Sequence, residues 1–317
     1  MLAQALEALA IRADGVYCDA TFGRGGHSAA LLAALGPHGR LLSIDRDGQA
    51  IAAGQPMLEG RPDDAPRFDL VHDRFSNLPA IVSRVGIAQL DGVLFDLGVS
   101  SPQLDQAERG FSFMRDGPLD MRMDPGSGEP AWQWLDRVDE KELTKVISNY
   151  GEERFARAIA KAIVTRRADV ARPALRTTKQ LADLVAGVVR SRSRGAKMAK
   201  NPATRTFQAI RLFVNQELEE LSVVLSHAVD HLAPGGRLVV ISFHSLEDRM
   251  VKQFMANESG QHAARHPISG VPMHERAPRL KVFKRVLAGA DEADLNVRAR
   301  SAVLRVAERL DTAEAHA

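Results

Sequence analysis

A glycine-rich turn near the N-terminus limits the folds open to this chain. Val16 to Asp19 is a short β-rich run that ends in an acid, and the turn Thr21-Phe-Gly-Arg-Gly-Gly-His27 follows it. Glycines permit a tight turn from strand to helix and let backbone approach a ligand closely. A second apolar run, Arg40 to Ile44, ends in Asp45. An acid at this distance beyond a glycine turn predicts a site for the ribose of a nucleoside cofactor.

The spacing of the glycines bears on which nucleoside cofactor binds. A dinucleotide site needs G-x-G-x-x-G, whose helix N-terminus receives a pyrophosphate. Gly23-Arg-Gly-Gly-His-Ser28 lacks that spacing, which disfavours a nicotinamide-dependent reductase. S-adenosylmethionine has no phosphate, so it needs only the glycine turn and the ribose acid. The pattern by itself leaves two interpretations: a site for this cofactor, or a tight turn in another α/β enzyme.

The order of the predicted elements indicates an α/β fold with a doubly wound parallel sheet. Strand and helix patterns alternate over the first hundred residues, as in βαβ units. After Pro102 helical patterns dominate, and strand character returns at 236–242, 280–287 and 302–306. We therefore expect a helical domain inserted after strand four, with the helices at 131–135, 140–148, 152–167, 179–190 and 206–232. The expected divisions are 1–106, 107–206 and 207–317.

Three acidic positions are expected to meet at one edge of this sheet. Asp45, Asp73 and Asp96 each follow an apolar strand pattern, and ligands in such sheets gather outside the carboxyl ends of strands. Asp45 could instead cap a helix and Asp96 could cap a turn. Their positions at strand ends, after a glycine turn, favour a functional role for both.

Composition and charge narrow the class of protein further. No apolar run is long enough to span a bilayer, and the N-terminus does not resemble a signal peptide, so we expect a cytoplasmic protein without a membrane partner. The single cysteine, Cys18, gives neither an internal disulfide nor a metal cluster. Residues 151–210 contain 14 Lys and Arg against 4 Asp and Glu. This basic region predicts either a polyanionic partner or a solvated helical face.

Seven motifs in one order resemble those of a known family. They are Thr21–Ser28, Asp96–Leu104, Arg109–Phe113, Pro118–Asp124, Tyr150–Glu153, Ala203–Gln208 and Ile241–Asp248. The chain resembles the bacterial RsmH (MraW) family, which methylates N4 of a cytidine in small-subunit (16S) ribosomal RNA, in the decoding region, with S-adenosylmethionine. The resemblance runs from Met1 almost to the C-terminus. It implies a class I methyltransferase (Rossmann-like) sheet with a helical domain inserted after strand four.

The resemblance also implies a set of cofactor-binding residues: Gly25, Gly26 and His27 in the first turn, Asp45 at the ribose, Phe75 at the adenine, and Asp96 with Gln103 near the methionine end. Without the resemblance, Phe75 would be interpreted as a core residue. His27 is interpreted as a cofactor contact and not as a base. Family members usually carry His-x-Pro-Val just before Met1-Leu2, and we expect a late start codon or a truncation here.

The implied reaction needs positioning and polarisation more than a strong catalyst. A cytosine N4 amine is a poor nucleophile, so acceptors should draw on its hydrogens as charge develops. Asp96 is the candidate catalytic residue, together with backbone carbonyls of 97–100. The expected partner is 16S ribosomal RNA or the 30S subunit, with phosphate contacts from basic residues of the insertion: Arg154, Arg157, Arg166, Arg167, Arg192, Arg194, Lys197 and Lys200. The alternative is a non-catalytic RNA-binding protein that keeps the fold.

Overall fold

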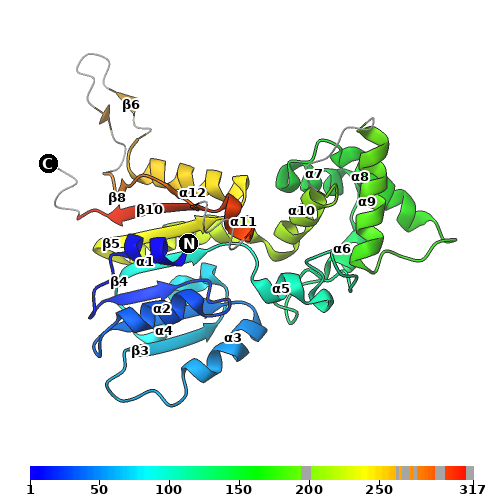
Figure 1. Cartoon of the computed structure of the whole chain (residues 1–317). Coiled ribbons are helices and arrows are strands. Elements are labelled where there is room, and N and C mark those ends of the chain that lie inside the picture. Colours follow the sequence, from blue (N-terminus) through cyan, green and yellow to red (C-terminus); the bar gives the residue numbers. More distant parts are fainter. Residues whose placement is uncertain (194–200, 262–263, 266–271, 274–276, 290–296, 312–317) are drawn as a thin grey trace. The chain divides into compact units, whose positions relative to one another are not determined.

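The chain folds into two compact units (Figure 1). The computed structural model describes residues 1–193, 201–261, 264–265, 272–273, 277–289 and 297–311. The first unit combines 1–98 with 218–317, and the second is 99–217. The sequence also predicts two exposed loops, a basic one at 191–201 and a long one at 258–278. Residues 194–200 of the first and much of the second lie outside the described residues.

The first unit is built on one eight-stranded sheet with the order β3-β2-β1-β4-β5-β10-β8, and β9 pairs with β10. Strands β1 to β5 run parallel, and β10 is antiparallel to β5 and to β8. The strands are β1 (Val16–Asp19), β2 (Arg40–Asp45), β3 (Arg67–His72), β4 (Leu90–Asp96), β5 (Leu232–Ser242), β8 (Leu280–Val282), β9 (Val286–Leu287) and β10 (Val303–Arg309). A separate two-stranded pair joins β6 (Ala264–Arg265) to β7 (Pro272–Met273).

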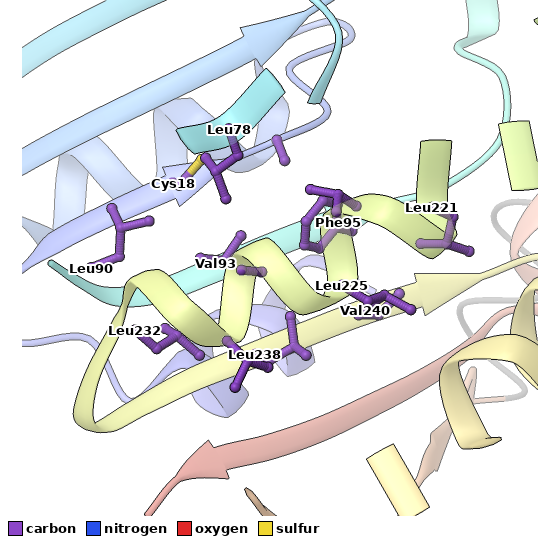
Figure 2. Close-up of a cluster of buried hydrophobic side chains, with 14 of the residues drawn as sticks. Cys18, Leu78, Leu90, Val93, Phe95, Leu221, Leu225, Leu232, Leu238 and Val240 are labelled. Atoms are coloured by element: carbon purple, nitrogen blue, oxygen red, sulfur yellow. The ribbon is translucent and has the colours of Figure 1, made fainter. Parts of the chain in front are cut away.

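Helices cover both faces of the sheet, which confirms the predicted doubly wound α/β class. One face packs against α4 (Leu78–Val85), α11 (Glu217–His231) and α12 (Ser245–Glu258). Figure 2 shows this core, where Leu221 and Leu225 of α11 lie against Phe95 and Val240 of the central strands. The opposite face packs against α1 (Leu2–Leu9), α2 (Gly26–Ala34) and α3 (Gly48–Gly54). Short 3-10 turns complete the unit: η1 (Gln55–Met57), η2 (Phe75–Asn77) and η4 (Val297–Ser301).

The second unit is helical around its own hydrophobic core. It contains α5 (Ser101–Asp105), η3 (Ala107–Arg109), α6 (Ala131–Arg137), α7 (Glu140–Gly151), α8 (Ala156–Ala168), α9 (Thr178–Arg192) and α10 (Thr204–Asn215). Trp134 is 1% exposed, and its ring centroid lies 4.4 Å from that of Phe213. No helix in the described part of the chain is long and apolar enough to cross a membrane.

The structure corrects the predicted single helix at 206–232. Helix α10 ends at Asn215, Gln216 adopts a left-handed conformation with φ 53°, and α11 starts at Glu217. The cause is tertiary. The buried Asn215 amide accepts a hydrogen bond from Met123 N at 2.7 Å and donates to Met121 O at 2.8 Å, so it serves a neighbouring loop at the point where the helix stops.

Two further differences lie near the C-terminus. The β-like run 280–287 forms two short strands, β8 and β9, that pair with different stretches of β10. Helix α12 has no counterpart among the sequence predictions. It starts at a capping box in which the side chain of Glu247 accepts from backbone N–H groups before the helix, a use of a glutamate that periodicity does not detect.

Replacing Asn215 by alanine should destabilise the second unit. The substitution leaves the buried Met123 N–H and Met121 carbonyl without these partners, which costs about 1–3 kcal/mol for each unsatisfied group. Chemical denaturation should show the loss, and hydrogen exchange should accelerate first at Met123. Asn149, an exposed residue of α7, gives the matched Asn→Ala control. An unchanged unfolding midpoint for Asn215→Ala would contradict the role of this side chain.

Candidate functional site

The candidate site lies where the strand order of the sheet reverses. Strand β1 pairs with β2 on one side and with β4 on the other, and ligands bind outside the carboxyl ends of strands at such a switch point. Asp19, Asp45 and Asp96 are the last residues of these three strands. The sheet therefore gathers three carboxylates at one edge.

The register of the strands sets these acids at two depths. Asp19 pairs with Ser43 of β2 and with Leu94 of β4, so it lies two residues short of Asp45 and Asp96 along those strands. Asp19 is fully buried, whereas the other two are half-buried at the rim. Its carboxylate accepts from Ser28 Oγ at 2.6 Å and from Thr21 N at 3.2 Å, and burial raises its pKa. Asp19 has no role among the sequence predictions, although the acid that ends the first strand is a visible signal.

The glycine turn holds α2 at this edge. Gly25 precedes the helix with φ +74°, and a Cβ there would lie 2.8 Å from the Phe22 ring, so both the conformation and the packing require glycine. Gly26 is the first helical residue, and a Cβ on it would meet no atom within 4 Å. The turn is thus tightly packed at Gly25 and open at Gly26, where a ligand can approach the backbone.

Asp45 is fixed by backbone donors on two sides. Its Oδ2 accepts from Gly23 N at 2.7 Å and its Oδ1 accepts from Asp47 N at 2.8 Å. Burial raises the pKa of Asp45 to about 6, against the opposing effect of these two hydrogen bonds. An ionised carboxylate has about four acceptor positions, so both oxygens keep capacity for the hydroxyl groups of a sugar. A ribose therefore fits this position.

Asp96 and His27 line a cavity of about 220 Å³ within the first unit. The cavity is also bounded by Met1, Leu2, Gly26, Ile241, Phe243, Ala299 and Ala302. His27 Nδ1 lies 3.6 Å from Asp96 Oδ2. The outer atoms of this pair, Asp96 Oδ1 and His27 Nε2, are buried and have no hydrogen-bond partner among the described residues. Burial raises the pKa of Asp96 to about 6, with His27 opposing the shift and Asp19 adding to it.

Phe75 and Gln103 lie in different units. Phe75 opens η2 after β3 and meets the Phe95 ring edge-on, with the centroids 5.7 Å apart, so its ring is part of the core as well as near the strand ends. Gln103 belongs to the second unit, where it is 5% exposed and its Oε1 accepts from Ser100 N at 2.9 Å. The predicted cofactor contacts of both residues stay predictions.

The donor set suits an organic cation with a hydroxylated sugar. The carboxylates of Asp45 and Asp96, the His27 side chain and the open backbone at Gly26 lie at this edge of the first unit, and S-adenosylmethionine carries both features that they match. His244, which has no firm role among the sequence predictions, is the N-cap of α12 and pairs with Glu247. Among the described residues, no three His, Cys, Asp or Glu side chains are arranged to hold a metal ion.

Comparison with known proteins gives one consistent relationship. Residues 1–310 match the model of the MraW methylase family. The ribosomal RNA small subunit methyltransferase H of Herminiimonas arsenicoxydans is 54% identical over 317 residues, covering 98% of this chain and 94% of that protein. The protein of the same name from Methylibium petroleiphilum is 53% identical over 312 residues, with 98% and 94% covered. Among solved structures, a putative rRNA methylase from Clostridium thermocellum is 14% identical, with a TM-score of 0.45 and 98% and 96% covered.

Replacing Asp96 by asparagine should stabilise the fold at neutral pH. The pKa of Asp96 is about 6 in the folded chain against 3.8 as its ordinary value, so the folded state binds the proton more tightly than the unfolded state. The contribution of Asp96 to the unfolding free energy is therefore present below pH 4 and is lost as the pH rises through 6. Above that pH the buried charge carries a cost that the neutral amide of the Asp96→Asn variant avoids.

Thermal unfolding measures this effect directly. At pH 7.5 we expect Asp96→Asn to unfold about 2 °C or more above the unmodified chain, corresponding to on the order of 1 kcal/mol after allowance for partial exposure. The difference should shrink toward pH 5, where the folded carboxyl is largely protonated. Asp64→Asn, at an exposed acid of the same unit, is the control. A lower Tm for Asp96→Asn at pH 7.5 would show that the carboxylate stabilises the fold.

Proposed function

This chain belongs to the MraW methylase family, and from that premise we propose that it transfers a methyl group from S-adenosylmethionine to the N4 amine of a cytidine in 16S ribosomal RNA. One observation carries the proposal: a glycine turn and three strand-ending carboxylates lie at one edge of the sheet in a chain that is 54% identical to a ribosomal RNA small subunit methyltransferase H. The free RNA or the 30S subunit is the proposed substrate.

The first unit holds the cofactor through residues that its own fold has already positioned. Asp45 accepts the ribose hydroxyls, and the backbone at Gly25, Gly26 and His27 approaches the amino-acid end. Phe75 packs beside the adenine, where it follows β3. Bound there, the cofactor supplies a methyl carbon activated by a positively charged sulfur, with a neutral thioether as leaving group. We also propose the predicted contact of Gln103 with the methionine end of the cofactor.

Asp96 is the proposed catalytic acceptor for the amine. Its Oδ1 is buried and has no hydrogen-bond partner in the described part of the chain, so it can accept from an amino hydrogen of a base in the cavity. A hydrogen bond to the N4 amine draws the lone pair out of the ring and strengthens as positive charge develops on nitrogen. The base has to be unstacked to reach it, which requires a single-stranded or flipped cytidine.

The second unit supplies the proposed phosphate contacts, and the structure sorts the candidate basic residues. Of these candidates, Arg154 and Arg157 are exposed, as is Lys161, which the sequence prediction did not include; no acidic side chain in the described ranges lies within ion-pair distance of any of the three. Arg167 instead donates to the carbonyls of Leu135 and Val138 from a partly buried position. Arg166 is half-buried and Arg192 is exposed. Arg194, Lys197 and Lys200 lie outside the described residues.

Helix α8 presents the clearest of these contacts. Arg157 and Lys161 are four residues apart, so they lie on the same face of the helix with Cβ atoms about 6 Å apart. The guanidinium of Arg154, just before the helix, lies over the Phe155 ring at 4.4 Å, which fixes its position. Unpaired cations at this spacing suit successive phosphates of an RNA strand. We propose this face of α8 as part of the RNA-binding surface.

Tritium transfer tests the reaction. Labelled S-adenosylmethionine is incubated with 30S subunits from a strain that lacks its own enzyme, and nucleoside analysis should place the label in N4-methylcytidine.

Asp45→Ala should weaken cofactor binding in calorimetry by about tenfold or more, since roughly 1.4 kcal/mol is lost with the ribose hydrogen bonds. Asp64→Ala is the control. Binding of the cofactor without transfer would favour the non-catalytic RNA-binding alternative, and tighter binding of NADH would favour a reductase.

Removing the charges on α8 should weaken RNA binding without affecting the cofactor. Arg157→Ala combined with Lys161→Ala should lower RNA affinity several-fold and reduce the slope of log K against log salt by about 1.4, or about 0.7 for each lost phosphate contact. Lys179→Ala is the matched control, because that exposed lysine is already paired with Asp183 at 2.7 Å. Equal slopes for the double variant and the control would place the RNA elsewhere on the second unit.

A further inference from the structure

Two buried polar atoms in the cavity lack a partner, and they belong to side chains that contact each other. Asp96 Oδ1 and His27 Nε2 are both buried without a hydrogen bond among the described residues, while Asp96 Oδ2 and His27 Nδ1 lie 3.6 Å apart. An unsatisfied buried polar group costs about 1–3 kcal/mol. Native structures keep few such groups, and those that persist commonly serve binding or catalysis. The pair therefore points to a ligand that satisfies both atoms.

The contact between the two side chains bears on which nitrogen of His27 can accept. A carboxylate is an acceptor only, so Asp96 Oδ2 at 3.6 Å favours the tautomer whose hydrogen is on the facing nitrogen, Nδ1. In neutral imidazole the other nitrogen, Nε2, then carries a lone pair. The fully buried Asp19 also interacts electrostatically with His27, which opposes the rise that burial causes in the pKa of Asp19.

We propose that His27 is the general base of the methyl transfer, accepting one hydrogen of the target amine at Nε2 while Asp96 Oδ1 accepts the other. The proposal rests on the function argued above and extends it, because the sequence interpretation of His27 is a cofactor contact only. Two acceptors from residues that line one cavity suit cytosine, whose N4 carries two hydrogens. Uracil offers an oxygen at that position and would meet two acceptors with no donor.

The step balances without a further reactant. The N4 lone pair forms the new N–C bond as the C–S bond breaks, and the electron pair of that bond stays on sulfur. The nitrogen then carries a positive charge and one surplus proton. His27 Nε2 takes that proton, and the resulting imidazolium keeps its Nδ1 beside the Asp96 carboxylate. General-base transfer of this kind typically contributes about 10²–10⁴-fold to the rate.

The competing explanation is that His27 only shapes the cofactor site. The backbone of His27 lies in the first turn of α2 whatever its side chain. If the side chain only shapes the cofactor site, its substitution should weaken cofactor binding. If the side chain is a base, its substitution should lower kcat even at saturating cofactor. The two roles are therefore separable by measuring the dissociation constant for S-adenosylmethionine and single-turnover transfer to 30S subunits on the same variants.

The test uses His27→Ala and His27→Gln in the full chain. We expect single-turnover transfer to fall about 100-fold or more in both, with cofactor affinity within about threefold of the unmodified chain. Added imidazole should restore transfer about tenfold or more in His27→Ala, whose cavity can admit it, and not in His27→Gln, whose side chain fills the space. Pyrazole, a ring of the same shape but a much weaker base, should restore nothing.

Several outcomes would overturn the proposal. Transfer by His27→Gln at more than half the normal rate would show that no base is needed at this position. A loss of transfer that saturating cofactor repairs would assign His27 to cofactor binding, and equal rescue by imidazole and pyrazole would assign it to packing. The unmodified chain in the same assay separates this inference from the proposed function: if it labels no cytidine, the proposed function itself fails.

Discussion

The candidate site of the first unit depends on desolvated carboxylates at the ends of neighbouring parallel strands. Parallel pairing of β1 with β2 and β4 brings Asp19, Asp45 and Asp96 to one edge, and the two-residue stagger of Asp19 sends it into the interior. Burial of charged groups in a low dielectric opposes folding, and this desolvation raises the pKa of each of the three acids. The fold tolerates them because Gly23, Asp47, Thr21 and Ser28 donate hydrogen bonds to two of them.

The hydrogen bonding of the third acid, Asp96, differs from that of Asp45 and Asp19. Asp45 has both oxygens bonded to backbone and Asp19 has both oxygens bonded to the turn and α2, so each is held in one orientation. Asp96 is fixed through its backbone, whose N–H donates to Thr21 Oγ1 at 2.7 Å, while its carboxylate lies beside His27 and keeps one buried oxygen without a partner among the described residues. A fixed backbone together with a carboxylate oxygen that lacks a hydrogen bond is the arrangement expected of a residue that binds a ligand, and not of one that stabilises the fold.

Local sequence signals were enough to predict the strand ends, and tertiary interactions account for what they missed. Asp45 and Asp96 could be predicted because each closes an apolar run beyond the glycine turn. The depth of Asp19 depends on strand register, which a single sequence does not contain. The break at Gln216 was hidden because an uninterrupted helical pattern spans it, and only the bonds from Asn215 to the 121–123 loop end α10 there. The unpaired atoms of His27 and Asp96 likewise emerge only from the packed cavity of the described chain.

A count of basic residues overstates the RNA-binding surface of the second unit, because some of these residues are already ion-paired. Arg176 pairs with Asp136 at 2.8 Å and Lys179 pairs with Asp183 at 2.7 Å, so the charges of these two cations are already neutralised inside the unit. A paired cation brings little net field to an approaching polyanion, whereas an unpaired one attracts it and releases counterions on contact. The exposed Arg157 and Lys161 of α8, which have no ion-pair partner among the described residues, therefore support the proposed RNA-binding surface more strongly than the paired cations of the same unit do.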